Sequence, residues 1–214
     1  MEKVLVVSRG LLFQGNDFHG FIPLDEAPGR GATWLDSIRL HAHFASRAEV
    51  ETDPGYKQII PYAVLLRGDE MLLFQRLSGG GERRLHRMLS VGVGGHINSG
   101  DEGQGEDRLM AGARRELLEE VSIDHGNMGI VGFVNDDTNP VGSVHFGVVF
   151  RVDVGGASPV SREPSQLDAR MHPLQDVLSR FVADPGAFET WSSLVLSAWD
   201  RLVRVTPVLA MPVP

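Results

Sequence analysis

The stretch Gly92–Ile123, GVGGHINSGDEGQGEDRLMAGARRELLEEVSI, joins a glycine-rich turn to a polar insert and then to an amphipathic run. In its second half, apolar residues recur at helical spacing: Met110, Ala113, Leu117 and Val121. Such a stripe is typical of a helix that packs one face against a core. The sequence therefore predicts a helix from about Glu106 to near Val121.

Three carboxylates, those of Glu116, Glu119 and Glu120, fall on one arc of this predicted helix, beside its apolar stripe. Their repulsion is unfavourable, because a like-charge pair four residues apart costs roughly 0.2–0.5 kcal/mol. Acids near a helix C-terminus also face the negative end of the macrodipole, at ~0.3–1 kcal/mol each. Arg115 relieves part of this repulsion, and a hard divalent cation such as Mg²⁺ would neutralise the rest. A solvated acidic face is the alternative, but the glycine turn and Arg115 favour a metal site.

The residues Gly95 and RELLEEVSI (115–123) resemble the Nudix box, in which a glycine and a spaced acid precede the pattern R-E-U-x-E-E-x-G-U, with U aliphatic. Ser122 departs from this pattern, because it stands where a glycine is usual, so a left-handed C-cap there would be strained or replaced. The spacing from Gly95 to Arg115 is also longer than in the family, which indicates an insert around residues 101–105. Asp101 and Asp107 both remain candidates for the first acid of the box.

The resemblance implies a fold and an activity. The expected fold class is α/β: a Nudix-like α/β/α sandwich around a mixed β-sheet, with an N-terminal extension. The expected activity is that of a Nudix-type pyrophosphohydrolase, a metal-dependent hydrolase of a nucleoside diphosphate linked to another moiety. Activated water would cleave the diphosphate bond, with Mg²⁺ or, as an alternative, Mn²⁺ as the cofactor.

Carried over residue by residue, the resemblance also implies site residues. The metal ligands would be the carbonyl of Gly95 and the carboxylates of Glu116, Glu119 and Glu120. The general base would be Glu119 or Glu163, the second because an acid from a late loop serves this role in several members of the family. Arg115 would complete the catalytic set by orienting the glutamates. His96, in the glycine turn, is expected to be a solvent-facing turn residue and not a ligand.

Composition limits the other classes of function. The chain has 214 residues, 42% hydrophobic and 22% charged, as in a soluble globular protein. It has no cysteine, which excludes disulfides and thiolate metal sites. We expect a cytoplasmic protein without a membrane segment, because the chain contains neither a signal peptide nor an apolar run of the ~20 residues that a membrane helix needs. A net charge of −8 argues against binding of duplex nucleic acid. The expected partner is a small nucleoside diphosphate derivative, and the many dimers of the family leave a homodimer open.

The chain is expected to divide into an N-terminal extension (1–55), a Nudix-like catalytic domain with a C-terminal helix (56–205) and a tail (206–214). In the extension, residues 3–7 suit a strand, and Thr33–Ala45 predicts a helix capped by Thr33. An acidic Pro-Gly turn at residues 49–55 marks the boundary.

Beyond this boundary, strands are expected at 58–67 and 70–76, joined as a hairpin by Gly68-Asp69. Further strands are expected at 88–93, 129–135 and 144–152, and one long amphipathic helix at 185–204. The loop 78–84 with the basic residues after it is an alternative anion-binding segment.

Two other functions compete with hydrolysis. A ligand-binding or regulatory module could keep the Nudix-like scaffold without the activity, and Ser122 and the lengthened box favour this alternative. An isoprenoid diphosphate isomerase is disfavoured, because the isomerases with this scaffold use a cysteine and the chain has none.

Overall fold

The computed structural model of the protein describes residues 2–26, 30–76, 88–101, 107–123, 126–162 and 167–207. The strands are β1 (Lys3–Ser8), β2 (Gly20–Pro23), β3 (His43–Ser46), β4 (Tyr56–Arg67), β5 (Glu70–Arg76), β6 (Leu89–Ser90), β7 (Gly92–Gly94), β8 (Asn127–Asn135), β9 (His145–Asp153) and β10 (Leu167–Pro173). The α-helices are α1 (Arg9–Phe13), α2 (Arg30–His41), α3 (Arg47–Val50), α4 (Arg108–Val121), α5 (Pro140–Val144), α6 (Leu174–Ala183), α7 (Thr190–Ser197) and α8 (Trp199–Leu202), with 3₁₀ turns η2 (Ser99–Asp101) and η3 (Pro185–Ala187).

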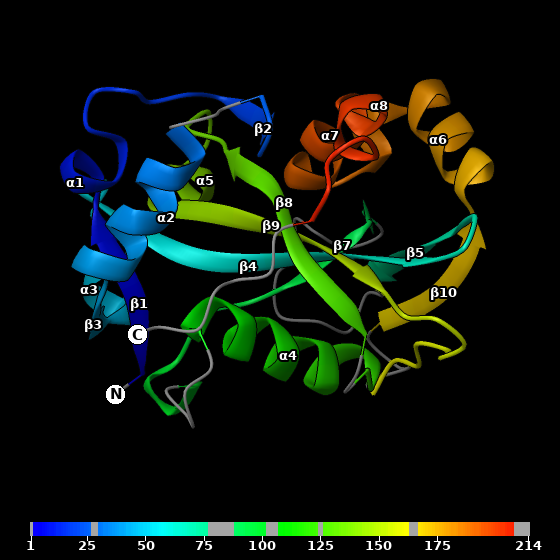
Figure 1. Ribbon diagram of the computed structural model, residues 1–214, viewed down its shortest axis with the longest axis horizontal. Helices are drawn as coiled ribbons and strands as arrows, with labels where there is room; N and C mark the ends of the chain where they lie inside the picture. Colours follow the sequence, from blue (N-terminus) through cyan, green and yellow to red (C-terminus); the bar gives the residue numbers. More distant parts are fainter. Residues whose placement is uncertain are drawn as a thin grey trace.

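A mixed sheet forms the centre of the molecule, with the strand order β10-β5-β4-β9-β8-β2 (Figure 1). The long strands β4 and β9 run parallel along nine paired positions, whereas β5, β7 and β1 pair antiparallel with β4. β4 is buried along most of its length, and its near-continuous apolar sequence is that of a central strand. The short β7, which leads into the glycine turn, is held in place by pairing with β4.

Helices cover both faces of this sheet. The helix α4 lies on one face, where Met110, Ala113, Leu117 and Val121 enter the larger hydrophobic core. The helices α6 to α8 lie on the other face (Figure 1), where Trp199 and Leu202 belong to a second core. This arrangement confirms the predicted α/β/α sandwich around a mixed sheet.

The described part of the first fifty-five residues packs with the rest of the chain. β1 pairs with β4 through the Val6–Gln58 register, and β3 pairs with β1. Trp34 and Ile38 of α2 are buried in the core that α4 also covers. The boundary at residue 55 stays a prediction, but its two sides share one sheet and one core.

Two predicted helices have different bounds in the structure. α2 begins at Arg30 and ends at His41, so Thr33 lies inside the helix and does not cap it. The next residues leave the helix because β3 pairs with β1, and this tertiary contact outweighs the helical spacing. The long helix expected at 185–204 is also wrong: η3, α7 and α8 replace it, with Phe188 extended and a break at Ala198. No helix among the described residues is long and apolar enough to span a bilayer.

Candidate active site

The glycine turn follows β7 and contacts the helix α4 directly. A β-carbon on Gly94 would lie 2.6 Å from the carbonyl oxygen of Pro61 in β4. A β-carbon on Gly95 would overlap the carboxyl group of Glu116. Only glycine allows the main chain to approach its neighbours this closely. The turn therefore places backbone without side chains directly against Glu116 of α4.

The guanidinium of Arg115 ties this turn to the acids of α4. Its Nη2 donates to the carbonyl oxygen of His96 at 2.6 Å, and its Nε donates to Asp101 Oδ1 at 2.8 Å. Its Nη1 lies 2.8 Å from Glu116 Oε1 and 2.8 Å from Glu119 Oε2. Because a guanidinium presents its donors in a rigid plane, these contacts fix the two glutamates relative to the turn.

Asp101 and Asp107, both candidates for the spaced acid, have different roles in the structure. Asp101 is buried beside Arg115 and also accepts a hydrogen bond from the backbone N–H of Asn98 at 2.7 Å. Asp107 is the N-cap of α4, where its Oδ1 accepts from the N–H of Leu109 at 2.9 Å. Only Asp101 therefore contacts the arginine that holds the glutamates.

The three glutamates differ in their exposure to solvent. The Glu116 side chain is 13% exposed, and that of Glu119 is 56% exposed. Glu120 is half-buried. Burial raises the pKa of Glu116, although the charge and hydrogen bond of Arg115 act in the opposite direction. The cluster thus contains one enclosed acid held at an energetic cost and one acid open to solvent.

A cavity of about 380 Å³ lies beside the turn. Gly95 and His96 form part of its wall, and the N-terminal region contributes Arg47 and Glu51. The segment from Asp136 to His145, the start of α7, and Ile60 and Tyr62 of β4 also line it. The cavity is therefore bounded by segments that are far apart in the sequence.

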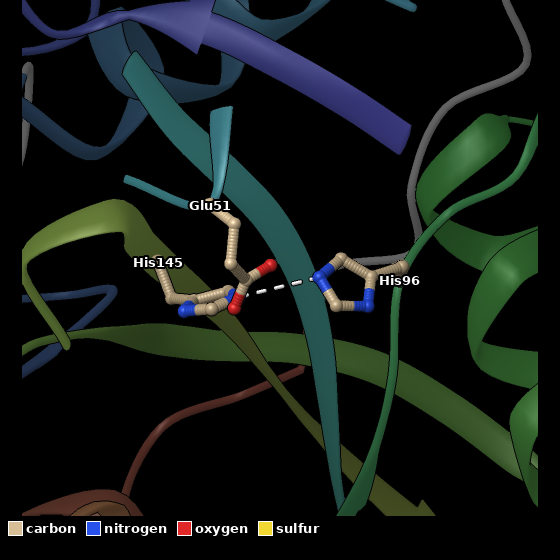
Figure 2. Close-up of side chains that lie close together, drawn as sticks. All are labelled: Glu51, His96 and His145. Atoms are coloured by element: carbon tan, nitrogen blue, oxygen red, sulfur yellow. Dashed lines mark hydrogen bonds between the residues drawn. The ribbon is translucent and has the colours of Figure 1, made fainter. Parts of the chain in front are cut away.

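Two histidines and a glutamate meet in the wall of this cavity (Figure 2). The Nε2 atoms of His96 and His145 lie 3.2 Å apart, and Nδ1 of His145 lies 2.7 Å from the carbonyl oxygen of Val141. Burial lowers the pKa of His96 to about 3 and also lowers the pKa of His145, so both rings are uncharged at neutral pH. The expectation that His96 faces solvent is therefore wrong, because its ring is half-buried and turned toward His145.

A family model described as the NUDIX domain matches residues 57–192. The chain belongs to the Nudix family. The Bacillus subtilis protein YmaB is 34% identical to this Nudix chain over 203 residues, which cover 91% of the chain and 96% of YmaB.

Solved structures agree with this assignment. Tm1382, a provisional Nudix hydrolase, shares 26% identity and superposes with a TM-score of 0.74 over 94% of this chain and 99% of its own. DR0079 from Deinococcus radiodurans is 18% identical, with a TM-score of 0.51 over 74% of this chain and 93% of its own, and shows the fold alone. The predicted enzyme class, a Nudix-type pyrophosphohydrolase, is confirmed by these findings.

A Nudix hydrolase generally needs a divalent cation, and the residues of this Nudix box fit one. The fit rests on two features. The backbone of Gly95 approaches Glu116 so closely that a β-carbon would not fit between them, and α4 carries its carboxylates at spacings of three and four residues. Backbone and carboxylate oxygens are the donors that Mg²⁺ prefers. Gly95, Glu116, Glu119 and Glu120 therefore stay the predicted ligands.

Several predicted elements of the Nudix site lie outside the described residues. Glu163, the second candidate for the general base, is among them, as are the loop at 78–84 and the basic residues that follow it.

Sequence reasoning missed His145 and Glu51. His145 is 49 positions from His96 in the chain, and only the parallel pairing of β9 with β4 brings it near the turn. Glu51 lies in the acidic segment 49–55, for which the sequence predicts a domain boundary. No local sequence signal marks either residue, because their proximity depends on the sheet register.

Proposed function

We propose that the protein cleaves a diphosphate bond in a nucleoside diphosphate linked to another moiety, with Mg²⁺ or Mn²⁺ as the cofactor. The contact between Gly95 and Glu116 carries this proposal, because it places the backbone of the glycine turn directly against the first carboxylate of the cluster. Gly95, Glu116, Glu119 and Glu120 would hold the cation. When bound, such a cation neutralises phosphate charge and lowers the pKa of water.

The residues of the chain divide the remaining work. Arg115 is a positioning residue, since all its described partners belong to the turn or to the acids and hold the site together. Glu119 is the most exposed of the three glutamates, so it is suited to accept the proton of the attacking water. Glu163 remains the alternative base. The cavity beside the turn would receive part of the substrate.

The test is cleavage of nucleotide sugars, dinucleotides, coenzyme A compounds, nucleoside triphosphates and ADP-ribose, each with Mg²⁺ and with EDTA, followed by chromatography of the phosphorylated products. Chromatography is needed because water splits a diphosphate bridge between two organic groups into two phosphomonoesters, without free phosphate. We expect cleavage of at least one compound and its loss with EDTA. Glu119→Gln and Glu120→Gln should each lower kcat by about 10²-fold or more, as expected for loss of a proton acceptor or metal ligand. Glu49→Gln, on the exposed side of α3, is the matched control.

Wild-type turnover in both box variants would contradict the assigned site. If the folded, metal-bound protein cleaves none of the compounds in the panel, a binding module would be favoured over a hydrolase.

A further inference from the structure

The cluster of His96, His145 and Glu51 lies in the cavity and has no part in the proposed hydrolysis. Its ligand atoms all lie within 4.8 Å of one another. The three side chains point toward one another from separate elements (Figure 2): the turn after β7, the first residue of β9 and the end of α3. Two imidazoles and one carboxylate form a donor set that differs in kind from the oxygen ligands of the Nudix box.

The spacing of the two rings matches shared coordination of one ion. Zinc binds histidine nitrogen at about 2.0–2.1 Å, so two nitrogens in a tetrahedral site lie roughly 3.3 Å apart. The observed separation of the Nε2 atoms is 3.2 Å. The same separation suits a hydrogen bond between the rings, in which one Nε2 carries a proton. An ion would replace that bond after the proton of His96 moves from Nε2 to Nδ1. This change of tautomer leaves the imidazole ring uncharged.

The surroundings of His145 hold its ring as a ligand. Its Nδ1 lies 2.7 Å from the carbonyl oxygen of Val141, an acceptor, so Nδ1 carries the proton and Nε2 presents its lone pair toward His96. Metal-binding histidines commonly have such an outer hydrogen bond, which fixes both tautomer and orientation. His145 is also 7% exposed, so its ring has little freedom to leave this orientation.

The carboxylate of Glu51 completes the set from the N-terminal region. Arg47, one turn earlier, contacts Glu51 at 3.5 Å but also pairs with Glu2 at 3.1 Å, so its charge is shared. All three ligands line the cavity, which leaves the remaining coordination positions open toward it. Three protein ligands with an open position are typical of catalytic and substrate-binding zinc sites.

We propose that Glu51, His96 and His145 bind one borderline transition-metal ion, Zn²⁺ in the first instance, with open coordination toward the cavity. The site is separate from the oxygen-rich site of the Nudix box, and it gives the N-terminal region a function. Glu51 brings the third ligand to a cavity that is lined mainly by residues of the NUDIX domain. An anionic oxygen of a ligand in the cavity can complete the coordination.

The test is a Zn²⁺ titration of the chelator-treated full chain by calorimetry, in excess Mg²⁺ so that an oxygen-ligand site is already filled. Imidazole sites favour zinc over magnesium, so one equivalent should still bind. His96→Gln and Glu51→Gln should each weaken binding about 100-fold or more, because outer-shell changes alone cost about 10–100-fold. His43→Gln and Glu49→Gln, both exposed in the same region, should leave it unchanged.

Binding that survives in both ligand variants, or that disappears in Glu120→Gln and persists without His96, would overturn the proposal. If a variant fails to fold, X-ray absorption at the zinc edge can still identify the atoms that coordinate zinc in the wild-type protein. We expect the spectrum to show scattering from two imidazole rings. A coordination shell made only of oxygen atoms would overturn the proposal. Zinc binding is measured apart from turnover, so failure here leaves the proposed hydrolysis standing, and the reverse also holds.

Discussion

Gly95 lies so close to Glu116 that a β-carbon at position 95 would overlap the carboxyl group of the glutamate. Gly95→Ala must therefore displace Glu116 or the turn. We expect kcat to fall by about 10²-fold, since misplacement near 1 Å can have an effect of this size. Gly100→Ala is the matched control, because a β-carbon there meets nothing within 4 Å. Equal kinetics in the two variants would show that the contact has no role in turnover.

The sequence predicted the box better than the cavity, and the reason is physical. Helical spacing and the REUxEE pattern are local, so α4, its acids and Arg115 could be assigned from one short stretch. The His96–His145 contact depends on strand register, which no local pattern encodes. The insert before α4 left Asp101 and Asp107 equivalent in the sequence, and only their partners in space separate them.

Asp101 and Asp107 should respond differently to substitution. Asp101→Asn removes the charge that holds Arg115, so we expect kcat to fall at least tenfold. Asp107→Ala removes the N-cap of α4 and should lower stability by about 0.5–2 kcal/mol, with kcat close to that of the wild type. Thermal unfolding and steady-state kinetics of both variants check this. The reverse pattern would assign the acid beside Arg115 a purely structural role.

Glu116 should destabilise the metal-free protein. The folded state raises the pKa of Glu116, so it holds this proton more tightly than the unfolded chain does. The charged carboxylate therefore reduces stability as pH rises above its ordinary pKa of about 4.3. We expect Glu116→Gln to raise the Tm at pH 7 without metal, because the neutral amide avoids the cost of burying the charge.

The same variant separates metal binding from folding. Mn²⁺ should raise the Tm of the wild type, because an ion that binds only the folded state stabilises by about 2.7 kcal/mol at a hundredfold excess over Kd. Glu116→Gln should lose most of this gain. Below about pH 4 the difference between the metal-free proteins should vanish, since Glu116 is then protonated in both states. A pH-independent difference would contradict the assigned cause.

Lys57 is fully buried and depends on Asp137 for its charge partner. Its Nζ lies 2.6 Å from Asp137 Oδ1, and Arg9 contacts the same carboxylate. Although partial burial acts to raise the pKa of Asp137, hydrogen bonds from Arg9 and Lys57 lower it well below its ordinary value. Asp137 thus adds stability above its ordinary pKa of about 3.9, and this contribution is lost as pH falls through its folded value.

Asp137→Asn should therefore destabilise the protein at pH 7, by about 1.5–3 kcal/mol, as for hydrogen bonds to charged groups. The deficit should shrink as pH falls below 4. Lys57→Met combined with Asp137→Asn is the control, because removing both charges avoids an unpaired buried cation. Chemical unfolding at several pH values measures all three proteins, and a double variant no better than Asp137→Asn would exclude this explanation.

Ser122 ends α4 in the left-handed region, with a φ of 57°. This conformation costs an L-residue roughly 1–2 kcal/mol, a penalty that glycine does not have. The Ser122 hydroxyl accepts a 3.2 Å hydrogen bond from Arg162 at an exposed position, which offsets little of that cost. We expect Ser122→Gly to raise stability by up to about 1 kcal/mol, or about 2–4 °C in Tm. Ser122→Ala should give no gain, because alanine keeps the β-carbon that disfavours this region.

Neither substitution should alter kcat, since the C-cap holds none of the proposed ligands in place. A gain in Tm with unchanged kcat would show that Ser122 is a tolerated cap and no mark of lost activity, whereas a large change in kcat would make this position part of the active site.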